Sequence, residues 1–485
     1  VETHALADGA GTRLGRAVAA DVATHAGRSG FHALAAAPDG FAARVLLAHA
    51  ADRAIDAQYY LWHDDETGTL LLEALWRAAE RGVRVRLLVD DLDTAGQDER
   101  LAAFDAHPNV EVRLYNPFPN RRWRALDFAT DFARVNRRMH NKSLTADGEV
   151  AIVGGRNVGN EYYGAGDAVE FADLDVIAVG PVVRDVSAAF DLYWNSASAY
   201  PLASLVPAAP PDARATLEAT FAATRADPDA VAYVAALRDS TLVRALLEGR
   251  LPLDWAAARL VRDEPRKTLD TTDDASLLLL AELLPAIGAP QSSFDLVSPY
   301  FVPGERGTEV LAALARRGVR VRVLTNSLAA TDVGPVHAGY AKRRVALLRA
   351  GVRLFEYKPA AAPPPGGGKK GFASSRAGSL HAKTFALDAR RLFVGSFNFD
   401  PRSARLNTEM GVVIESPALA ARLVERLDDD LSAIAWEVRL RDDGALECIE
   451  RGTGGEARYD TEPGTTAMRR AWIRMLEAMP IDGLL

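Results

Sequence analysis

The chain has 485 residues, of which 48% are hydrophobic and 25% are charged, and its formal net charge is −8. This is the composition of a globular protein of roughly two to four domain-sized units, and it excludes a fibrous or disordered chain. The acidic balance argues against a nucleic-acid-binding protein. The single cysteine, Cys448, excludes an intrachain disulfide and a cysteine-based metal site.

The chain begins at Val1 instead of methionine, so we expect that a segment was removed from its N-terminus. A signal peptide, a lipid anchor or a membrane anchor would each explain this start. In the remaining chain no apolar run reaches the roughly 18 residues that a membrane-spanning helix needs. The longest apolar stretch starts at Ser276, contains Glu282 and Pro285, and predicts a buried helix.

A helix–strand pattern occurs twice along the chain. The segments RGVRVRLLVD at 81–90 and RGVRVRVLTN at 317–326 each follow a helical apolar pattern and then alternate in polarity as a strand does. A segment of the form H-x-K follows in each half, at His140 and at His381. Helices that alternate with strands predict an α/β layered fold in each half.

These repeats divide the chain into four parts. We expect a first lobe at 1–200, a helical connecting segment at 201–275, a second lobe at 276–440, and a tail at 441–485 that contains an amphipathic helix. The segment 360–378 is rich in proline and glycine, which predicts a loop just before the second H-x-K segment.

Both H-x-K segments begin a longer motif, H-x-K-x(4)-D, which is followed by a glycine and an asparagine at the same spacing in each half. The first copy contains His140, Lys142, Asp147, Gly155 and Asn157, and the second contains His381, Lys383, Asp388, Ser396 and Asn398. One copy alone would be a weak signal. Two copies with the same downstream spacing are a strong indication of one site that both halves build.

The motif predicts how these side chains meet. A histidine and a lysine two positions apart on a strand point to the same face. The strand would then turn at the aspartate and return as a hairpin, which brings the asparagine near the histidine. Two such hairpins side by side place two imidazoles, two ammonium groups and two amides around one point. This set suits attack on a phosphodiester.

Each motif residue also has a purely structural interpretation. A lone histidine in an apolar strand most often belongs to the core, but a buried lysine is costly unless it is paired. Asp147 and Asp388 stand at the expected turns, so we interpret them as turn formers or ion-pair partners that support the motif. No metal site is predicted, because the sequence has no HExxH motif, no cysteine pair and no carboxylates at ligand spacing.

The chain resembles the phospholipase D superfamily and, within it, the bacterial cardiolipin synthase branch. Beyond the two motifs, the resemblance rests on NRRMHNKS, IVGGRNVGNEYY, FADLDVIAVGPVV, SPYFVPG, TNSLAATDVGPVHAGY and GSFNFDPRSARLNTEMG, and it covers nearly the whole chain. It implies a pseudo-dimeric phospholipase D fold with two similar mixed-sheet lobes, flanking helices and one shared active site. It also implies transfer of a phosphatidyl group between phospholipids without a cofactor.

The resemblance implies roles for the motif residues. His140 would attack phosphorus and carry a phosphohistidine intermediate, and His381 would protonate the leaving alcohol and then deprotonate the incoming one. The side chains that would hold the phosphoryl oxygens are Lys142, Lys383, Asn157 and Asn398.

Residues beside the motif positions complete the implied site. Two carboxylates outside the motifs, Asp173 and Glu409, would orient the histidines. The halves differ at one motif position, where Gly155 stands in the first and Ser396 in the second, so only the second half offers a hydroxyl there. Arg156 is a further candidate on the side of the first half.

The implied substrates are phosphatidylglycerol and, as a further candidate, phosphatidylethanolamine. An arginine cluster before the first motif would hold an anionic headgroup or form a solvated charged face, and Arg137 and Arg138 are its substrate-binding candidates. Its other members are Arg121, Arg122, Arg124 and Arg134. His337 and Tyr340 would form a polar wall of the acceptor pocket.

The implied location is the surface of a membrane, with the protein peripheral at a bacterial inner membrane or its periplasmic face and without a nucleic-acid partner. Helical spacing at 467–479 favours such an interfacial helix, because it places apolar side chains on one face and arginines on the other. The apolar face comprises Met468, Trp472, Met475, Leu476 and Met479. The alternative is that this helix packs on the second lobe as core. The oligomeric state is left open.

Three other functions are compatible with parts of the sequence. Hydrolysis with water as the acceptor would use the same motifs, so the motifs do not separate it from transfer. The acidic balance and the branch-specific segments disfavour a phosphodiester nuclease. The intact histidine, lysine and asparagine of both halves disfavour an inactive scaffold that only binds membranes.

Overall fold

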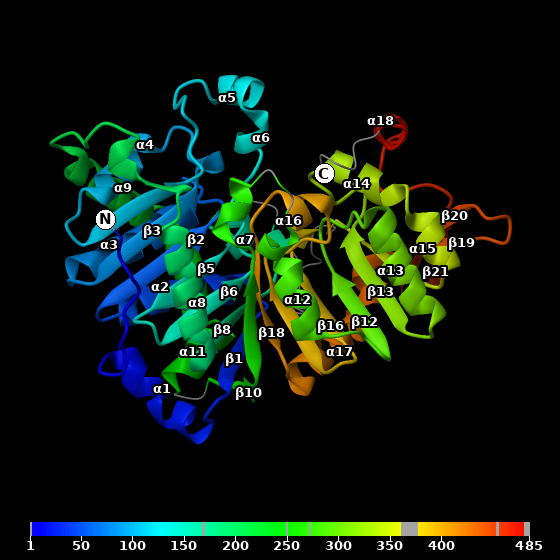
Figure 1. Ribbon diagram of the computed structural model, residues 1–485, viewed down its shortest axis with the longest axis horizontal. Helices are drawn as coiled ribbons and strands as arrows, with labels where there is room; N and C mark the ends of the chain where they lie inside the picture. The colour runs from blue at the N-terminus through cyan, green and yellow to red at the C-terminus, as the bar shows by residue number, and fades with distance from the viewer. Residues whose placement is uncertain are drawn as a thin grey trace.

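Two large β-sheets with flanking helices lie side by side in the computed structural model of the protein (Figure 1). The structure describes residues 2–166, 170–248, 251–270, 272, 274–359, 377–452 and 455–479. The N-terminal half of the chain builds one sheet and most of the C-terminal half builds the other.

The first half contains a nine-stranded sheet. In spatial order its strands are β10 (Asp254–Ala256), β1 (Ser29–Leu34), β8 (Asp175–Val179), β6 (Val150–Gly154), β5 (Ser143–Ala146), β2 (Ala54–Tyr59), β3 (Arg84–Asp90), β4 (Val110–Tyr115) and β9 (Ala199–Pro201). Its helices are α1 (Arg13–Thr24), α2 (Ala37–Ala50), α3 (Glu66–Glu80), α4 (Asp98–Asp105), α5 (Arg124–Thr130), α6 (Phe132–Val135), α7 (Asn160–Tyr163), α8 (Pro181–Trp194), α9 (Ala213–Ala226), α10 (Pro228–Arg238) and α11 (Thr241–Leu247).

The second half contains a ten-stranded sheet. In spatial order its strands are β11 (Ala258–Arg262), β18 (Met410–Ile414), β17 (Arg391–Gly395), β16 (Thr384–Leu387), β12 (Ser293–Val297), β13 (Arg320–Asn326), β14 (Arg353–Tyr357), β19 (Ala435–Leu440), β20 (Leu446–Gly452) and β21 (Gly455–Tyr459). Its helices are α12 (Leu279–Ile287), α13 (Gly304–Arg316), α14 (Gly334–Ala341), α15 (Arg344–Arg349), α16 (Pro401–Arg405), α17 (Pro417–Ile434) and α18 (Ala467–Glu477).

The two sheets repeat one topology. The order β8-β6-β5-β2-β3-β4 in the first corresponds to β18-β17-β16-β12-β13-β14 in the second. In each sheet the last three of these strands are parallel and the first three are antiparallel. The predicted helix–strand repeat is α3 followed by β3 and α13 followed by β13. The structure therefore confirms the α/β class with two similar mixed-sheet lobes.

The two halves share a hydrophobic core. Side chains of α8 and α17 fill the space against both sheets, where Val153 and Val176 of the first belong to the same buried cluster as Val394 and Val412 of the second. A small parallel sheet also joins the halves, because β7 (Glu170–Ala172) pairs with β15 (Ala377–Leu380). A core and a sheet built from both halves hold them in one fixed relation, which a shared site requires.

Several segments differ from the sequence-based expectation. The connecting segment 201–275 contains helices α9 to α11 but also strands β10 and β11, which extend the two sheets. The tail at 441–485 adds a hairpin, β20 and β21, to the second sheet before α18 begins. The expected loop at 360–378 lies outside the described residues except for its last two, which begin β15.

The helices of the structure agree with the expectation, drawn from the sequence, that no apolar run is long enough to span a membrane. Within the described ranges, none of the helices combines the length and the apolar composition needed to cross a bilayer. The longest apolar stretch forms α12, in which Leu279, Leu283 and Ile287 are buried while Leu284 is exposed.

Candidate active site between the two halves

The two H-x-K segments lie at the junction of the halves, and each pairs with the other half through its backbone. The amide of His140 donates to the carbonyl oxygen of Thr408 at 2.8 Å, and the amide of His381 donates to that of Ala172 at 2.8 Å. We expected the histidine and lysine on a strand, but both segments are extended chain just before β5 and β16. Each segment leaves its own sheet there, which lets it reach the partner half.

Each histidine is held by a carboxylate from the opposite half. His140 Nδ1 lies 2.8 Å from Glu409 Oε2, and His381 Nδ1 lies 2.6 Å from Asp173 Oδ2. All four side chains are buried. Thr408 and Ala172 directly precede Glu409 and Asp173 in the chain. The backbone hydrogen bond of each histidine therefore also positions the carboxylate that holds its ring. In each case Nδ1 faces the carboxylate, which leaves Nε2 free for chemistry.

Burial and neighbouring cations shift the titration of this site. Burial, with the charges of Lys142 and Lys383, lowers the pKa of His140 well below its usual value. Burial lowers the pKa of Lys383 to about 8 and that of Lys142 well below its usual range. Lys142, Lys383 and His381 all lower the pKa of His140, as expected of cations that share one buried site. An anionic phosphate among them would restore the charge of the ammonium groups, because an opposite charge favours the ionised form.

The two carboxylates titrate differently. Burial raises the pKa of Glu409 to about 7, although Lys142 and the hydroxyls of Ser396 and Ser403 act in the opposite direction. Burial also opposes ionisation of Asp173, but the charge of His381 and its hydrogen bond hold the pKa of Asp173 below its usual range. At neutral pH Asp173 is therefore a firm acceptor for Nδ1–H of His381.

The two motif asparagines are both buried. Asn157 donates from Nδ2 to the hydroxyl of Tyr162 at 2.9 Å and accepts from the amide of Leu61 at 3.2 Å. Asn398 Oδ1 is buried and has no hydrogen-bond partner within the part of the chain that the structure describes. A buried amide without a partner is costly and is a feature of sites that bind polar ligands.

The motif aspartates lie away from the histidines, at the hairpin turns. Asp147 has φ +53° and accepts from the amides of Asp52, Arg53 and Ala54. Asp388 has φ +55° and accepts from the amides of residues 291–293 in the same way. Each carboxylate thus ties its hairpin to the start of the neighbouring strand, β2 or β12. This geometry matches a turn former with backbone partners.

The difference between Gly155 and Ser396 has a steric cause. Ser396 Oγ donates to Glu409 Oε2 at 2.5 Å, whereas a Cβ atom on Gly155 would lie 2.2 Å from Asp173 Oδ1. The carboxylate of Asp173 therefore lies against the backbone of Gly155, in the space that the Ser396 side chain occupies in the second half. Arg156 does not point at the phosphate position, because its buried guanidinium donates to the carbonyl of Asp173 and pairs with Asp175.

Gly155→Ser is expected to lower turnover about 100-fold, because the added Cβ must push Asp173 away from His381. The matched control is Ser396→Gly, which removes a hydroxyl without adding atoms. Steady-state turnover with phospholipid vesicles measures both, and near-normal turnover of Gly155→Ser would contradict the steric explanation.

Two substrate-binding predictions are corrected by the structure. Arg138 is fully buried, with its guanidinium on Asp90 and on the carbonyl oxygens of Val135 and Asn116, so it supports the His140 segment instead of meeting a headgroup. Met139 donates its amide to the same Asp90 carboxylate.

His337 and Tyr340 form no open pocket wall either. Both are buried on α14, where His337 lies 3.8 Å from Glu462 and Tyr340 lies under the Arg344 guanidinium. Both side chains therefore belong to the packing of the second half.

The remaining arginines of the cluster are mostly paired. Arg137 is half-buried and donates to the carbonyl of Lys267 at 2.8 Å. Arg121 and Arg124 pair with Asp91, and Arg134 pairs with Asp131, whereas Arg122 is exposed. Arg137 and Arg122 are thus the members of the cluster whose side chains are accessible to an anionic headgroup.

Aromatic rings that sequence reasoning did not select surround the histidines. The ring of Tyr60 meets His140 edge-on at 4.9 Å and lies 5.2 Å from Lys142 Nζ. Tyr162 meets His381 edge-on at 5.2 Å, and Phe171 stacks on it at 5.3 Å. Tyr162 lies shortly after the first motif asparagine and Phe171 lies just before Asp173. Their position close to the motif residues in the sequence could have indicated that they contact the site.

Two lobes of one topology, with a buried histidine, lysine and asparagine from each at their junction, are the arrangement of the pseudo-dimeric phospholipase D fold. The chain belongs to the family described as cardiolipin synthase, PLD-like domain, whose model matches residues 44–190 and 283–431. It is 44% identical to cardiolipin synthase C of Escherichia coli (strain K12), over 98% of this chain and 100% of that one.

More distant relatives agree with this assignment. The chain is 29% identical to cardiolipin synthase A of Pseudomonas putida (strain GB-1), over 77% of this chain and 62% of that one. The crystal structure of phosphatidylserine synthase from Haemophilus influenzae Rd KW20 superposes with a TM-score of 0.54 at 13% identity, over 92% of this chain and 91% of that one. At this identity the superposition supports the shared fold alone.

Proposed function

We propose that the protein is a phosphatidyltransferase that moves a phosphatidyl group from one phospholipid to a hydroxyl of another, with phosphatidylglycerol as a substrate and cardiolipin as the product. The observation that carries this proposal is the crosswise pairing of His140 with Glu409 and of His381 with Asp173. It provides two oriented imidazoles in one buried site, one for attack and one for proton transfer.

In the first step, the Nε2 lone pair of His140 forms a bond to phosphorus while the bond from phosphorus to the donor alcohol breaks. The leaving oxygen takes the Nε2 proton of His381. The low pKa of His140 keeps its imidazole neutral, as a nucleophile must be, and Glu409 would accept a hydrogen bond from its Nδ1–H and so orient the ring. Lys142 and Lys383 would stabilise the charge on the phosphoryl oxygens.

In the second step, the acceptor hydroxyl gives its proton to the neutral His381, and its oxygen bonds to phosphorus as the bond to His140 breaks. Asp173 stabilises the imidazolium form of His381 before the first step and after the second, because it stays ionised beside it. The same sequence with water as the acceptor is hydrolysis, which is the second candidate function.

Product analysis tests the proposal and separates these two functions. We expect labelled phosphatidylglycerol alone, or with phosphatidylethanolamine, to give labelled cardiolipin with release of glycerol or ethanolamine. The control is the doubly inactive variant His140→Ala with His381→Ala. Phosphatidic acid as the main product would identify a hydrolase, and absence of both products with all lipid mixtures would contradict a phospholipid substrate.

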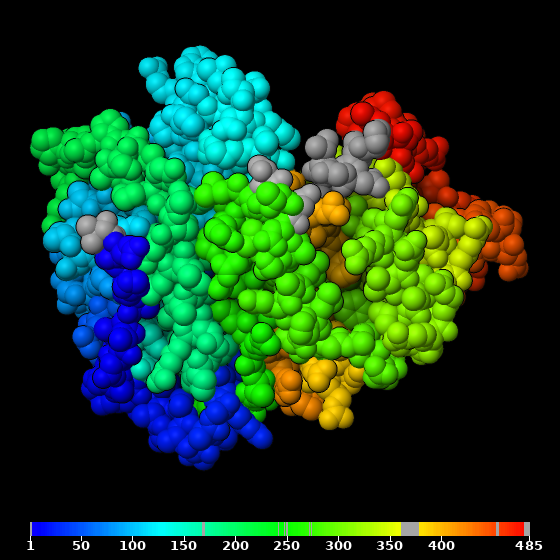
Figure 2. Space-filling view, viewed as in Figure 1, coloured from blue at the N-terminus to red at the C-terminus, as the bar shows by residue number. Residues whose placement is uncertain are grey.

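The location that we propose is peripheral, with the active-site entrance on the membrane. Two exposed apolar surfaces stand on the same edge of the molecule, α5–α6 in cyan and α18 in red (Figure 2). The short helices α7 and α16, which follow the two motif asparagines, are drawn below this edge, α7 beneath α5–α6 and α16 on the side towards α18 (Figure 1). The exposed side chains are Trp123, Leu126, Phe128 and Phe132 on one surface, and Met468, Trp472, Met475 and Met479 on the other.

The C-terminal helix is attached by the side opposite to this apolar surface. Ile473 and Leu476 are buried against Leu328 and Ala338, whereas Met468 is 81% exposed and Trp472 is 50% exposed. Leu476 therefore faces inward, unlike the prediction that placed it with the methionines. A helix anchored on one face with Trp and Met on the other can insert into the interfacial region of a bilayer.

We expect Trp472→Ser with Met475→Ser to weaken binding to anionic vesicles about tenfold or more, because two large apolar side chains no longer enter the bilayer. Cleavage of a soluble phosphodiester should stay unchanged. The matched control is Val310→Ser on α13, which is equally exposed in the same half. Vesicle sedimentation measures the affinity, and undiminished binding of the double variant would place docking elsewhere.

A further inference from the structure

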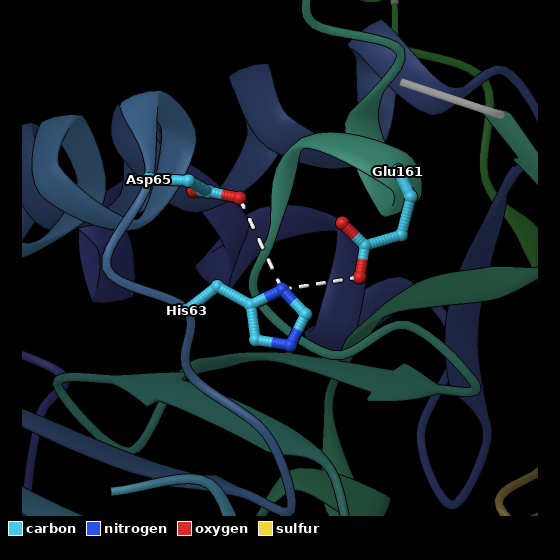
Figure 3. A group of neighbouring side chains, drawn as sticks. All are labelled: His63, Asp65 and Glu161. Carbon is cyan, nitrogen blue, oxygen red and sulfur yellow. Dashed lines mark ion pairs between the residues drawn. The ribbon is translucent and has the colours of Figure 1, made fainter. Parts of the chain in front are cut away.

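A second polar cluster lies at the N-terminal end of α3, outside the histidine–lysine–asparagine sets. His63 Nδ1 is 3.1 Å from Glu161 Oε1 and 4.0 Å from Asp65 Oδ2, and Figure 3 shows both carboxylates directed at this nitrogen. The three ligand atoms all lie within 4.8 Å of one another. The three side chains are partly exposed, so solvent and ions can reach them.

The opposite side of the His63 ring provides a second, independent observation. Asp93 Oδ2 lies 3.4 Å from Nε2 as an ion-pair contact, and this oxygen is buried and has no hydrogen-bond partner in the described ranges. A carboxylate that accepts Nε2–H fixes the tautomer with a lone pair on Nδ1, which is the form that binds a metal. Asp93 is thus placed as the outer carboxylate of a carboxylate–histidine–metal arrangement.

We propose that His63, Asp65 and Glu161 bind a divalent transition-metal ion such as Zn²⁺ or Mn²⁺. One imidazole nitrogen with two carboxylate oxygens is a donor set that such ions accept. Bonds of about 2.0–2.2 Å to a common ion place neighbouring donors about 3–4 Å apart, which matches the separations around His63 Nδ1. Solvent would complete the coordination on the exposed side.

The backbone around the cluster is already fixed for such a site. Asp65 caps α3, with Oδ1 accepting from the amide of Gly68, while Oδ2 accepts from the amide of Asn160. Gly159 leaves the space that His63 and Glu161 occupy, because a Cβ atom there would lie 2.7 Å from His63 Nδ1. The donors are therefore held by the rigid ends of α3 and α7.

The ion would fasten α7 beside the active site. Glu161 is followed by Tyr162, whose hydroxyl accepts from Asn157 and whose ring contacts His381. A metal on Glu161 therefore fixes the element that carries this tyrosine, so Glu161 is a positioning residue and the ion takes no part in bond making. The inference does not depend on which phosphodiester the enzyme transfers.

A test is direct binding of Zn²⁺ and Mn²⁺ to the chelator-treated full chain, expressed without a histidine tag. Calorimetry should show one ion per chain, and Co²⁺ as a probe should give a visible absorption band. Glu161→Gln should lower the affinity about 100-fold or more, and Asp93→Asn about tenfold. Asp64→Asn is the matched control, because Asp64 neighbours Asp65 but pairs with Arg100.

The outcomes decide between a metal site and an ion pair. Saturable one-to-one binding that Glu161→Gln and Asp93→Asn weaken, and Asp64→Asn does not, supports the site. Absence of binding would overturn the proposal, and so would binding that all three variants retain. In either case the carboxylates would serve only to hold His63 as an imidazolium. If Glu161→Gln fails to fold, Asp93→Asn decides, since it keeps all three ligands.

Discussion

His140→Ala is expected to lower turnover of phospholipid by a factor of about 10⁴ or more, whatever the leaving group. The substitution removes the atom that forms the bond to phosphorus, and no other described side chain pairs with Glu409 as an imidazole does. His381→Ala should cause a comparable loss with a phospholipid, whose alkoxide leaving group needs a proton. The two variants should then differ with an activated substrate.

A substrate with a good leaving group separates the two roles. It needs no acid, so His381→Ala should still release the leaving group in a burst of about one equivalent and accumulate a phosphoryl adduct on the peptide that contains His140. His140→Ala should show no burst. The control is His32→Ala, which removes a histidine on β1 outside the site. An adduct on His381 would reverse the assignment of nucleophile and acid.

Asp173→Asn is expected to lower turnover of phospholipid by a factor of about 10³–10⁴, because an amide presented to His381 favours the wrong tautomer and does not stabilise the imidazolium. The activated substrate should restore most of the burst, since Asp173 acts through the acid. Glu409→Gln should cause a similar loss that the activated substrate does not restore, because Glu409 acts through the nucleophile.

The control for these substitutions is Asp185→Asn, the same chemical change on the surface of α8. Thermal unfolding of each variant separates a positioning role from loss of the fold. If the activated substrate restored both variants equally, or neither, the crosswise assignment of the carboxylates would be wrong.

The sequence alone determined what depends on local spacing. The period of apolar residues predicted α3–β3 and α13–β13, because a helix and a strand each bury one face at a fixed repeat. The doubled motif predicted two hairpins, and the structure has them at β5–β6 and β16–β17. The site residues themselves were also selected by spacing, since each histidine–lysine–asparagine set lies within one short segment.

Only the tertiary structure decided which distant groups meet. Asp173 and Glu409 were recognised as carboxylates beside the motifs, but nothing local states that each orients the histidine of the other half. That exchange follows from the backbone hydrogen bonds across the junction. Each H-x-K segment pairs with the segment of the other half that carries the carboxylate. Arg138 shows a prediction that failed for the same reason. Its charge predicted a contact with a headgroup, but in the folded chain it is buried in an ion pair with Asp90 at the end of β3.

The cluster around His63 shows the same limit. His63 and Asp65 are neighbours, but Glu161 comes from α7 and Asp93 from the segment after β3, so no ligand spacing is visible along the chain. Spacing records contacts within one element, whereas packing of elements distant in sequence creates sites whose members share no pattern. The core of the first half, which contains Trp62 and Tyr162, holds the elements that carry the His63 cluster, and the shared core of the two halves holds the histidine–carboxylate pairs in place.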